Sequence, residues 1–348
     1  MTLRVGVVGL GTIGKRVADA VLSQPDMELV GVGIRTPNPT ALSVNWKGVK
    51  IYCTENERLP LFKECNLDVS GNLSDLLNEI DVVVDCAQAG EGVKRLSQYK
   101  AHGVYTILQG GEKHDTTDFT FSTFGNYHQA YGRQAMRVSS CNTTGLVRLI
   151  SVLDFHYKVL HVDGAIVRCS TDPDKAQNGI PNGIAPVFGV SHHGPDLQLV
   201  LPHISIYTQA AAAPMYYSHL QMISIELENP LTRLKIIETL NQYPRILIQT
   251  KQEAGVNTAQ LFNSFNNSSR KRGDRPELFL WEESIQLVGN RLHLMTSIDM
   301  QCITIPETID AIRAITGIEK DRDKCMILTD EALNIVKKES SYKIEVGI

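Results

Sequence analysis

The segment 137–148 holds Cys141, the residue best suited to nucleophilic chemistry in this chain. The sequence reads Ser140-Cys141-Asn142 at the point where an apolar-ended strand gives way to the start of a helix. A cysteine at a helix N-terminus meets the positive end of the helix dipole, which favours the reactive thiolate over the thiol. The backbone N–H groups there can also stabilise an oxyanion on a substrate carbonyl. The segment therefore predicts a thiolate that attacks a carbonyl carbon.

Residues 9–14 read Gly-Leu-Gly-Thr-Ile-Gly, between an apolar strand and a helix start, which is the context of a dinucleotide-binding loop. Gly9 permits the tight turn, Gly11 lets the backbone approach a pyrophosphate, and Gly14 allows close packing of helix on strand. NAD-selective sites usually carry an acidic residue at the end of the second strand, whereas this chain has Arg35 and Thr36. Arg35 is either a 2′-phosphate contact or an exposed structural arginine. We therefore predict NADP, or NADP and NAD together, rather than strict NAD.

A nucleophilic cysteine after a dinucleotide-binding domain predicts oxidation of an aldehyde through a thioester, which needs a group to handle the proton. His219, before a predicted strand, is the first candidate for this base. His192 and His193 form a polar turn suited to an anionic substrate, and no third ligand of clear spacing accompanies them, so we predict no metal. Arg168, which ends an apolar strand, is either a phosphate or nicotinamide-side contact or the partner of Asp172 in an ion pair.

Buried apolar strands alternate with amphipathic helices in the first part of the chain, which predicts an α/β fold with a parallel, Rossmann-type sheet. The longer, alternating strands after Cys141 predict an α+β catalytic domain with an antiparallel sheet. The helix 306–315 has an apolar stripe that needs a partner surface, and we expect the first domain to supply it. We predict a nucleotide domain over 1–139 and 304–348 and a catalytic domain over 140–303. The expected strands are 3–8, 27–34, 81–85, 104–108, 162–169, 203–212, 221–227 and 292–298, and the expected helices are 14–23, 72–79, 92–102, 232–241, 258–265, 306–315 and 323–338.

The bulk properties are those of an ordinary globular protein of 348 residues with a formal net charge of -4. That charge gives no reason to expect a nucleic-acid or membrane partner. One short basic run, 269–275, is interrupted by glycine and aspartate and predicts a solvated loop. Seven scattered cysteines without a C-x-x-C pair are typical of reduced thiols, and no secretory leader or membrane-spanning run is visible. We therefore expect a cytoplasmic protein, with the six cysteines other than Cys141 structural.

Five blocks of this sequence resemble the archaeal-type, or type II, phosphorylating glyceraldehyde-3-phosphate dehydrogenases. They run in the family's order from the N-terminus to the last helices, so the resemblance covers nearly the whole chain. The blocks are Gly9–Gly14 with the following Lys-Arg-Val-Ala-Asp-Ala, Gln-Gly-Gly-Glu-Lys-His at 109–114, Ser-Ser-Cys-Asn-Thr-Thr-Gly-Leu at 139–146, Ser-His-His-Gly-Pro-Asp at 191–196 and Pro-Glu-Thr-Ile-Asp-Ala-Ile-Arg-Ala at 306–314.

The resemblance implies oxidation of glyceraldehyde 3-phosphate to 1,3-bisphosphoglycerate, a glycolytic or gluconeogenic step, with inorganic phosphate as second substrate. It implies NADP or NAD as hydride acceptor, a Rossmann domain completed by the C-terminal helices, and usually a homotetramer. By its motifs, Cys141 and His219 would be catalytic, Ser140, Asn142, His192 and His193 would contact the sugar phosphate, and Thr12, Ile13, Gly111 and Gln301 would line the cofactor.

The chain departs from the family pattern at three places, one of which is the family's basic residue after the second strand, here found one place later as Arg35. The family usually has two adjacent arginines where this chain has Arg168 and Cys169, so one charged contact is missing. The run 299–303 replaces the usual Gln-Glu-Ser-Asp around Gln301. Two alternatives stay open: another phosphorylated- or semialdehyde dehydrogenase of the same architecture, such as the aspartate-semialdehyde type, and a divergent cofactor-binding protein without catalysis.

Overall fold

The computed structural model describes residues 2–43, 48–109, 111–169, 182–215, 217–266 and 270–336. The chain divides into two compact units, and helix α7 crosses the division. The first unit takes in the chain up to Thr144 together with Thr304–Leu333, and the second takes in the described residues from Gly145 to Ile303.

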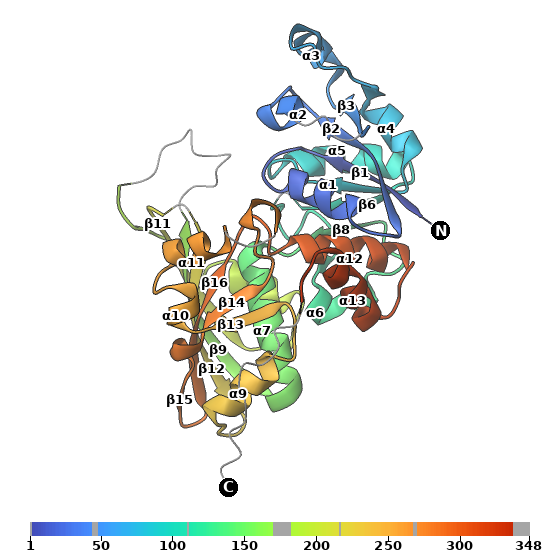
Figure 1. The fold of residues 1–348 in the computed structure, drawn as a ribbon. Helices are drawn as coiled ribbons and strands as arrows, with labels where there is room; N and C mark the ends of the chain where they lie inside the picture. Colours follow the sequence, from blue (N-terminus) through green and yellow to red (C-terminus); the bar gives the residue numbers. More distant parts are fainter. Residues whose placement is uncertain are drawn as a thin grey trace. The chain divides into compact units, whose positions relative to one another are not determined.

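The first unit is built on an eight-stranded sheet in which every pairing is parallel (Figure 1). Its strand order is β4-β3-β2-β1-β5-β6-β8-β7, which confirms the predicted Rossmann-type sheet. The strands are β1 Leu3–Val8, β2 Met27–Ile34, β3 Lys50–Cys53, β4 Gly71–Asn72, β5 Val82–Asp85, β6 Tyr105–Leu108, β7 Thr120–Phe121 and β8 Ala135–Val138. The helices are α1 Gly14–Leu22, α2 Pro39–Ser43, α3 Leu59–Glu64, α4 Leu73–Glu79, α5 Glu91–Ala101, α6 Thr123–Asn126, α12 Ile305–Thr316 and α13 Arg322–Ala332.

The second unit is built on another eight-stranded sheet, and here the prediction needs a correction. The centre is antiparallel as expected, with β12 between β9 and β16, but β11 pairs with β9 and β13 with β14 in parallel, so the sheet is mixed. The strands are β9 Val159–Cys169, β10 Ala185–Pro186, β11 Ile206–Ala213, β12 His219–Leu227, β13 Ile246–Gln249, β14 Leu278–Trp281, β15 Gln286–Val288 and β16 Arg291–Ile298. The helices are α7 Cys141–Tyr157, α8 His193–Gln198, α9 Arg233–Leu240, α10 Lys251–Ala254 and α11 Thr258–Phe265.

The C-terminal helices belong to the nucleotide-binding unit, as their apolar stripe predicts. Ile309, Ile312 and Ile315 are fully buried, and α12 packs against α1, β6 and β8 (Figure 1). The last helix is shorter than predicted, because α13 ends at Ala332 and Asn334 adopts a positive φ of 54° that a helix does not allow. The remainder of the predicted helix, from residue 337, lies outside the described residues.

Arg313 joins these helices to the start of β2 through a buried polar network. Its guanidinium donates to Asp26 at 2.7 and 2.8 Å, to Gln24 at 2.8 Å and to Thr329 at 2.6 Å. The side chain is 0% exposed. Removing one member of such a network leaves buried polar groups without partners.

We predict that Arg313→Met lowers the free energy of unfolding by about 3–5 kcal/mol, because the partly exposed Asp26 carboxylate and the buried Gln24 and Thr329 all lose their shared partner. Urea titration followed by circular dichroism measures the loss. Arg322→Met is the matched control, since Arg322 pairs with Asp323 on the surface, where ion pairs contribute about 0–1 kcal/mol. Equal losses in the two variants would contradict the prediction.

The basic run 270–275 is only partly the solvated loop that the sequence predicts. Lys271 and Arg272 are exposed, but Arg275 is 2% exposed, so that prediction is wrong for Arg275. Aromatic rings explain the difference, because the guanidinium of Arg275 lies 5.2 Å from the ring centre of Phe265 and 5.3 Å from that of Phe279. Favourable packing of a planar guanidinium on aromatic faces is a tertiary contact that a charge pattern does not reveal.

Candidate active site

Cys141 is the first residue of α7, and β8 ends three residues before it. The carbonyl of Ser140 accepts the N–H of Thr144 at 2.7 Å, and its Oγ accepts the N–H of Thr143 at 3.4 Å. These bonds close the first turn and confirm the predicted strand-to-helix transition. The Cys141 side chain is half-buried, and Asn142 beside it is 2% exposed. The thiol therefore lies at a helix N-terminus without being sealed in the core.

The glycine loop joins β1 to α1, the context that the motif requires. Gly9 has a φ of +87°, and a Cβ on it would lie 2.6 Å from the Ala87 nitrogen. A Cβ on Gly14 would lie 1.8 Å from the Gly9 carbonyl oxygen. Neither position tolerates a side chain, so the backbone packs as closely as a dinucleotide-binding turn must.

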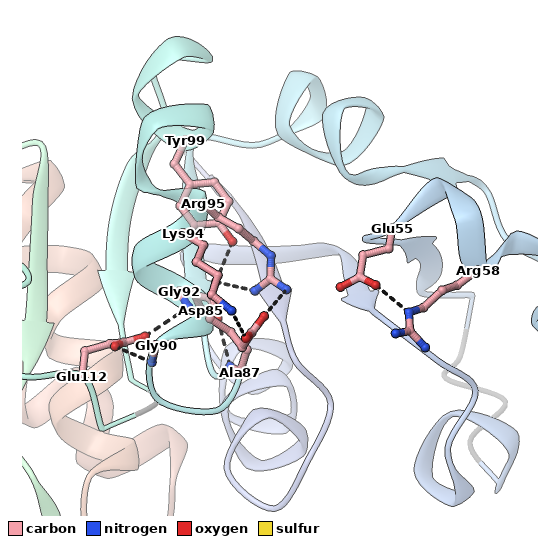
Figure 2. A network of polar contacts seen from close by, with 11 residues as sticks. Glu55, Arg58, Asp85, Ala87, Gly90, Gly92, Lys94, Arg95, Tyr99 and Glu112 are labelled. Carbon is pink, nitrogen blue, oxygen red and sulfur yellow. Dashed lines mark hydrogen bonds and ion pairs between the residues drawn. The ribbon is translucent and has the colours of Figure 1, made fainter.

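Helices α1 and α5 both begin at the carboxyl edge of the sheet, and their N-termini differ in charge. The Glu112 carboxylate accepts the N–H groups of Gly90 at 2.7 Å and Gly92 at 3.1 Å, which neutralises the start of α5 (Figure 2). Helix α1 has no acidic residue in its first turn, and its N-cap residue Ile13 offers no side-chain cap. The positive end of α1, preceded by the buried Thr12, therefore remains suited to an anionic ligand.

Asp85 forms the centre of a second polar cluster at this edge, which the sequence interpretation missed. It ends β5 with 1% exposure, and its carboxylate accepts the Tyr99 hydroxyl at 2.7 Å and the N–H of Ala87 at 2.9 Å, with Arg95 at 3.3 Å (Figure 2). An acidic residue that ends an otherwise apolar strand beside a glycine loop was the available signal. The cluster holds the turn after β5, whose Ala87 lies against Gly9.

The other predicted cofactor residues are Arg35, Gly111 and Gln301, of which the first two belong to the first unit and Gln301 to the second. Val8 pairs with Gly33 of β2 on one side and with Asp85 of β5 on the other. Arg35, which follows β2, and the turn after β5 therefore flank the glycine loop. Arg35 is exposed, and its charge contributes to a lowered pKa of the Glu91 carboxyl, after the larger effect of Lys94. Gly111, with a φ of +78°, follows β6 in the same unit, whereas Gln301 is buried in the turn after β16 in the second unit.

Arg168 and His219 are neighbours in the second sheet. The antiparallel register of β9 and β12 pairs Val167 with Leu220, which sets Arg168 opposite His219. The N–H of Cys169 donates to Nδ1 of His219 at 3.0 Å. Because Nδ1 accepts this bond, a neutral His219 carries its proton on Nε2. Cys169 thus orients the histidine through its backbone N–H.

His193 is held in the opposite tautomer. The hydroxyl of Thr208 donates to the Ser191 carbonyl at 3.1 Å, and the hydroxyl of Ser191 donates to Thr208 Oγ1 at 2.8 Å. Both hydroxyl protons are used, so the 3.1 Å contact between Ser191 Oγ and His193 Nδ1 has the histidine as donor. Neutral His193 therefore has a lone pair on Nε2, where His219 has a proton.

Both histidines favour the neutral form. Burial, followed by the charges of His192, Arg168 and His219, lowers the pKa of His193 to about 2. Burial and then the charge of Arg168 lower the pKa of His219 to about 4. Nε of Arg168 is buried without a hydrogen-bond partner among the described residues, and Asp172, its other predicted partner, lies outside them. The second unit thus brings three imidazoles close to Arg168, and Arg168 supplies the positive charge that an anionic ligand needs.

The lowered pKa values predict that stability falls as the pH drops below about 6.5. In the unfolded chain the histidines bind protons near that pH, whereas folded His219 and His193 do so only near 4 and 2, so the unfolded state binds more protons and gains from acidification. His193→Asn keeps a donor for Ser191 and removes the titration. Its urea midpoint should therefore depend less on pH between 7 and 5, by up to about 1.4 kcal/mol per pH unit. Identical pH slopes for variant and wild type would contradict the assignment.

Among the described residues no helix is long and apolar enough to cross a bilayer. Within the same ranges, no group of three histidine, cysteine, aspartate or glutamate side chains is arranged to hold a metal ion.

Comparison with known proteins identifies the family. Residues 140–265 match the glyceraldehyde 3-phosphate dehydrogenase C-terminal domain. The chain is 40% identical to the glyceraldehyde-3-phosphate dehydrogenase of Hyperthermus butylicus over 96% of its own length and 98% of that protein. It is 38% identical to those of Methanobrevibacter smithii, over 95% and 99% of the two lengths, and Thermococcus kodakarensis, over 97% and 100%. The chain belongs to the archaeal-type glyceraldehyde-3-phosphate dehydrogenase family.

Proposed function

We propose that this protein oxidises glyceraldehyde 3-phosphate to 1,3-bisphosphoglycerate, with NADP or NAD as hydride acceptor and inorganic phosphate as second substrate. The main support for this proposal is the position of Cys141, the first residue of a helix that directly follows a strand of a parallel dinucleotide-type sheet. Membership of the family supports the choice of substrate, because the relatives are named for it. We propose that the nucleotide domain comprises 1–139 with 304–348 and the catalytic domain 140–303.

The residues of the glycine loop fit a dinucleotide. We propose that Gly9, Gly11, Thr12, Ile13 and Gly14 hold its pyrophosphate at the uncapped start of α1, and that Gly111 and Gln301 line the rest. The absent side chains at Gly9 and Gly14 leave the backbone as the contact surface, and the first-turn N–H groups supply donors. Arg35 would receive a 2′-phosphate, since no carboxylate ends β2. When bound, the dinucleotide supplies the acceptor for the substrate's hydride.

Cys141 is the proposed nucleophile. Its thiolate adds to the aldehyde carbon, forming a C–S bond while the carbonyl electrons move to the oxygen as an alkoxide. Loss of hydride from that carbon then leaves a thioester on Cys141, and a phosphate oxygen attacks the thioester and expels the thiolate. Backbone N–H groups at Cys141 and Asn142, and the Ser140 hydroxyl, would stabilise the negative oxygen at the helix start.

The tautomer of His219 refines the role that the sequence predicts for it. A base must offer a lone pair, but the outer nitrogen of neutral His219 carries a proton, because Cys169 occupies Nδ1. We propose that Nε2–H of His219 donates to the substrate oxygen as it becomes negative, which lets hydride leave without prior proton removal. The lowered pKa keeps the ring in this single tautomer at neutral pH.

Phosphate groups are proposed to bind at Arg168, His192 and His193. The unpartnered Nε of Arg168 supplies a donor, and protonation of His193 would supply another. A dianion beside His193 favours its charged form, so binding should draw a proton onto Nε2.

Initial rates of cofactor reduction with glyceraldehyde 3-phosphate, with and without inorganic phosphate and with NADP and NAD in parallel, test the proposal. Reduction that depends on phosphate is expected. Reduction only with another semialdehyde would replace the substrate assignment, and no reduction from protein that binds NADP would indicate a non-catalytic cofactor-binding protein.

We also propose a cytoplasmic homotetramer. The open face of the second sheet supports self-association, because Met222 pairs with Met295 on neighbouring strands and both are about two-fifths exposed, at 38% and 43%. Tyr207, at 40%, lies on β11 of the same sheet, which is separated from β12 by β9. An apolar surface of this kind is typical of an interface. Analytical ultracentrifugation that showed only monomers would contradict the proposal.

A further inference from the structure

Arg275 is a buried cation with few partners. It precedes β14 and is 2% exposed, and burial lowers the pKa of its guanidinium. Nη2 donates to Ser218 Oγ at 3.3 Å and to Ser297 Oγ at 3.2 Å, while Nε and Nη1 are buried without hydrogen-bond partners among the described residues. The unmet donors of this buried guanidinium cost free energy, beside its favourable packing on Phe265 and Phe279. Packing alone does not account for where Nη2 donates.

One of its two hydroxyl partners lies beside the proposed catalytic histidine. Ser218 immediately precedes His219 and has a φ of +62°, a left-handed conformation that costs a non-glycine residue about 1–3 kcal/mol. Such a conformation persists only where the surroundings hold it. The Ser218 hydroxyl accepts from Arg275, and His219, the next residue, accepts the N–H of Cys169 on Nδ1.

Pro276, which follows Arg275, contacts α7, the helix that begins at Cys141. Arg148 on α7 is 0% exposed and donates to the carbonyl of Pro276 at 2.6 Å and to that of Ile303 at 2.7 Å. The backbone N–H of Arg275 donates to Cys302 Sγ at 3.0 Å, which ties the same segment to the turn after β16. The dipeptide Arg275-Pro276 thus contacts both the approach to His219 and the body of α7.

We propose that Arg275 is a positioning residue for His219, acting through the hydroxyl of Ser218. It keeps the ring where Nδ1 accepts the Cys169 N–H, so that the proton stays on Nε2. The inference rests on the proposed function of His219. It gives Arg275, a residue of the basic run, a part in the reaction that could not be predicted from the charges of that run.

A matched pair of variants separates positioning from stability. Ser218→Ala and Ser297→Ala each remove one acceptor of the same Arg275 nitrogen, and both serines are buried, at 2% and 0% exposure. Similar losses of stability are expected in both. Only Ser218→Ala should lower kcat, by about tenfold or more, because small misplacements of a catalytic group are costly. Ser297→Ala should stay within about twofold of wild type.

The ring nitrogens of His219 provide a readout that does not require turnover. In ¹⁵N NMR, wild type and Ser297→Ala should show one Nε2–H tautomer, and Ser218→Ala should show a mixture with a pKa raised toward 6.5. If Ser218→Ala fails to fold, Ser218→Gly removes the hydroxyl while accepting the positive φ. Equal effects of the two alanine variants on kcat and on the tautomer would overturn the positioning role. An inactive wild type would overturn the proposed function instead, and the tautomer comparison would still decide the role of Arg275.

Discussion

Cys141→Ser is expected to abolish turnover, by at least about 10⁴-fold, while cofactor binding stays at the wild-type level. The pKa of a serine hydroxyl lies far above that of a thiol. The helix N-terminus that stabilises a thiolate therefore leaves the serine protonated and weakly nucleophilic. Rates of cofactor reduction measure the first effect, and titration of NADPH fluorescence measures the second.

Cys65→Ser is the control for Cys141→Ser, because Cys65 is an exposed cysteine at the C-cap of α3. It should keep full activity. Wild-type Cys141 should also react with iodoacetamide faster than Cys65 despite its lower exposure, and Cys86, whose pKa burial raises well above the usual value, should react slowest of the three. Residual activity above about 1% in Cys141→Ser would remove Cys141 as the nucleophile.

His219→Asn is expected to lower kcat by about 10²–10³-fold, the cost of losing one donor to a developing oxyanion. The asparagine oxygen still accepts the N–H of Cys169, so the change removes mainly Nε2–H. His203→Asn is the control, since His203 lies on the surface beside Asp154.

The pH dependence of the His219→Asn effect distinguishes the donor role from a base role. The pKa of His219 is lowered to about 4, so its ring keeps one tautomer from pH 8 to 5, and the ratio of wild-type to variant kcat should be constant over that range. A ratio that falls below pH 6.5 would show a histidine of ordinary pKa acting as a base, and would contradict the tautomer assignment.

The local geometry of both proposed reactive elements could be predicted from neighbouring residues. The glycine loop lies between β1 and α1, and Cys141 lies between β8 and α7, because strand, turn and helix signals there are contiguous in the chain. Helix α11 and strand β2 have the predicted bounds for the same reason. The predictions that failed depended on distant partners: the parallel pairing of β9 with β11 and of β13 with β14, and the burial of Arg275.

The proton positions on the histidines needed the tertiary structure. His219 and His193 are both recognisable as candidates, but their tautomers are set by Cys169, fifty residues from His219, and by Thr208 through Ser191. Glu112 belongs to a block that the sequence singles out, yet its role at the start of α5 depends on Gly90, twenty-two residues away.

The sequence by itself determined the glycine turn and the position of Cys141 at its helix start, because both depend on residues that are contiguous in the chain. It also determined the parallel class of the first sheet, because strand and helix signals alternate along that part of the chain. The tertiary structure alone decided which ring nitrogens carry protons, which helix start stays uncapped and why an arginine lies buried beside Ser218. Hydrogen-bond direction and desolvation depend on groups that approach from other strands, and no pattern along one chain segment records them.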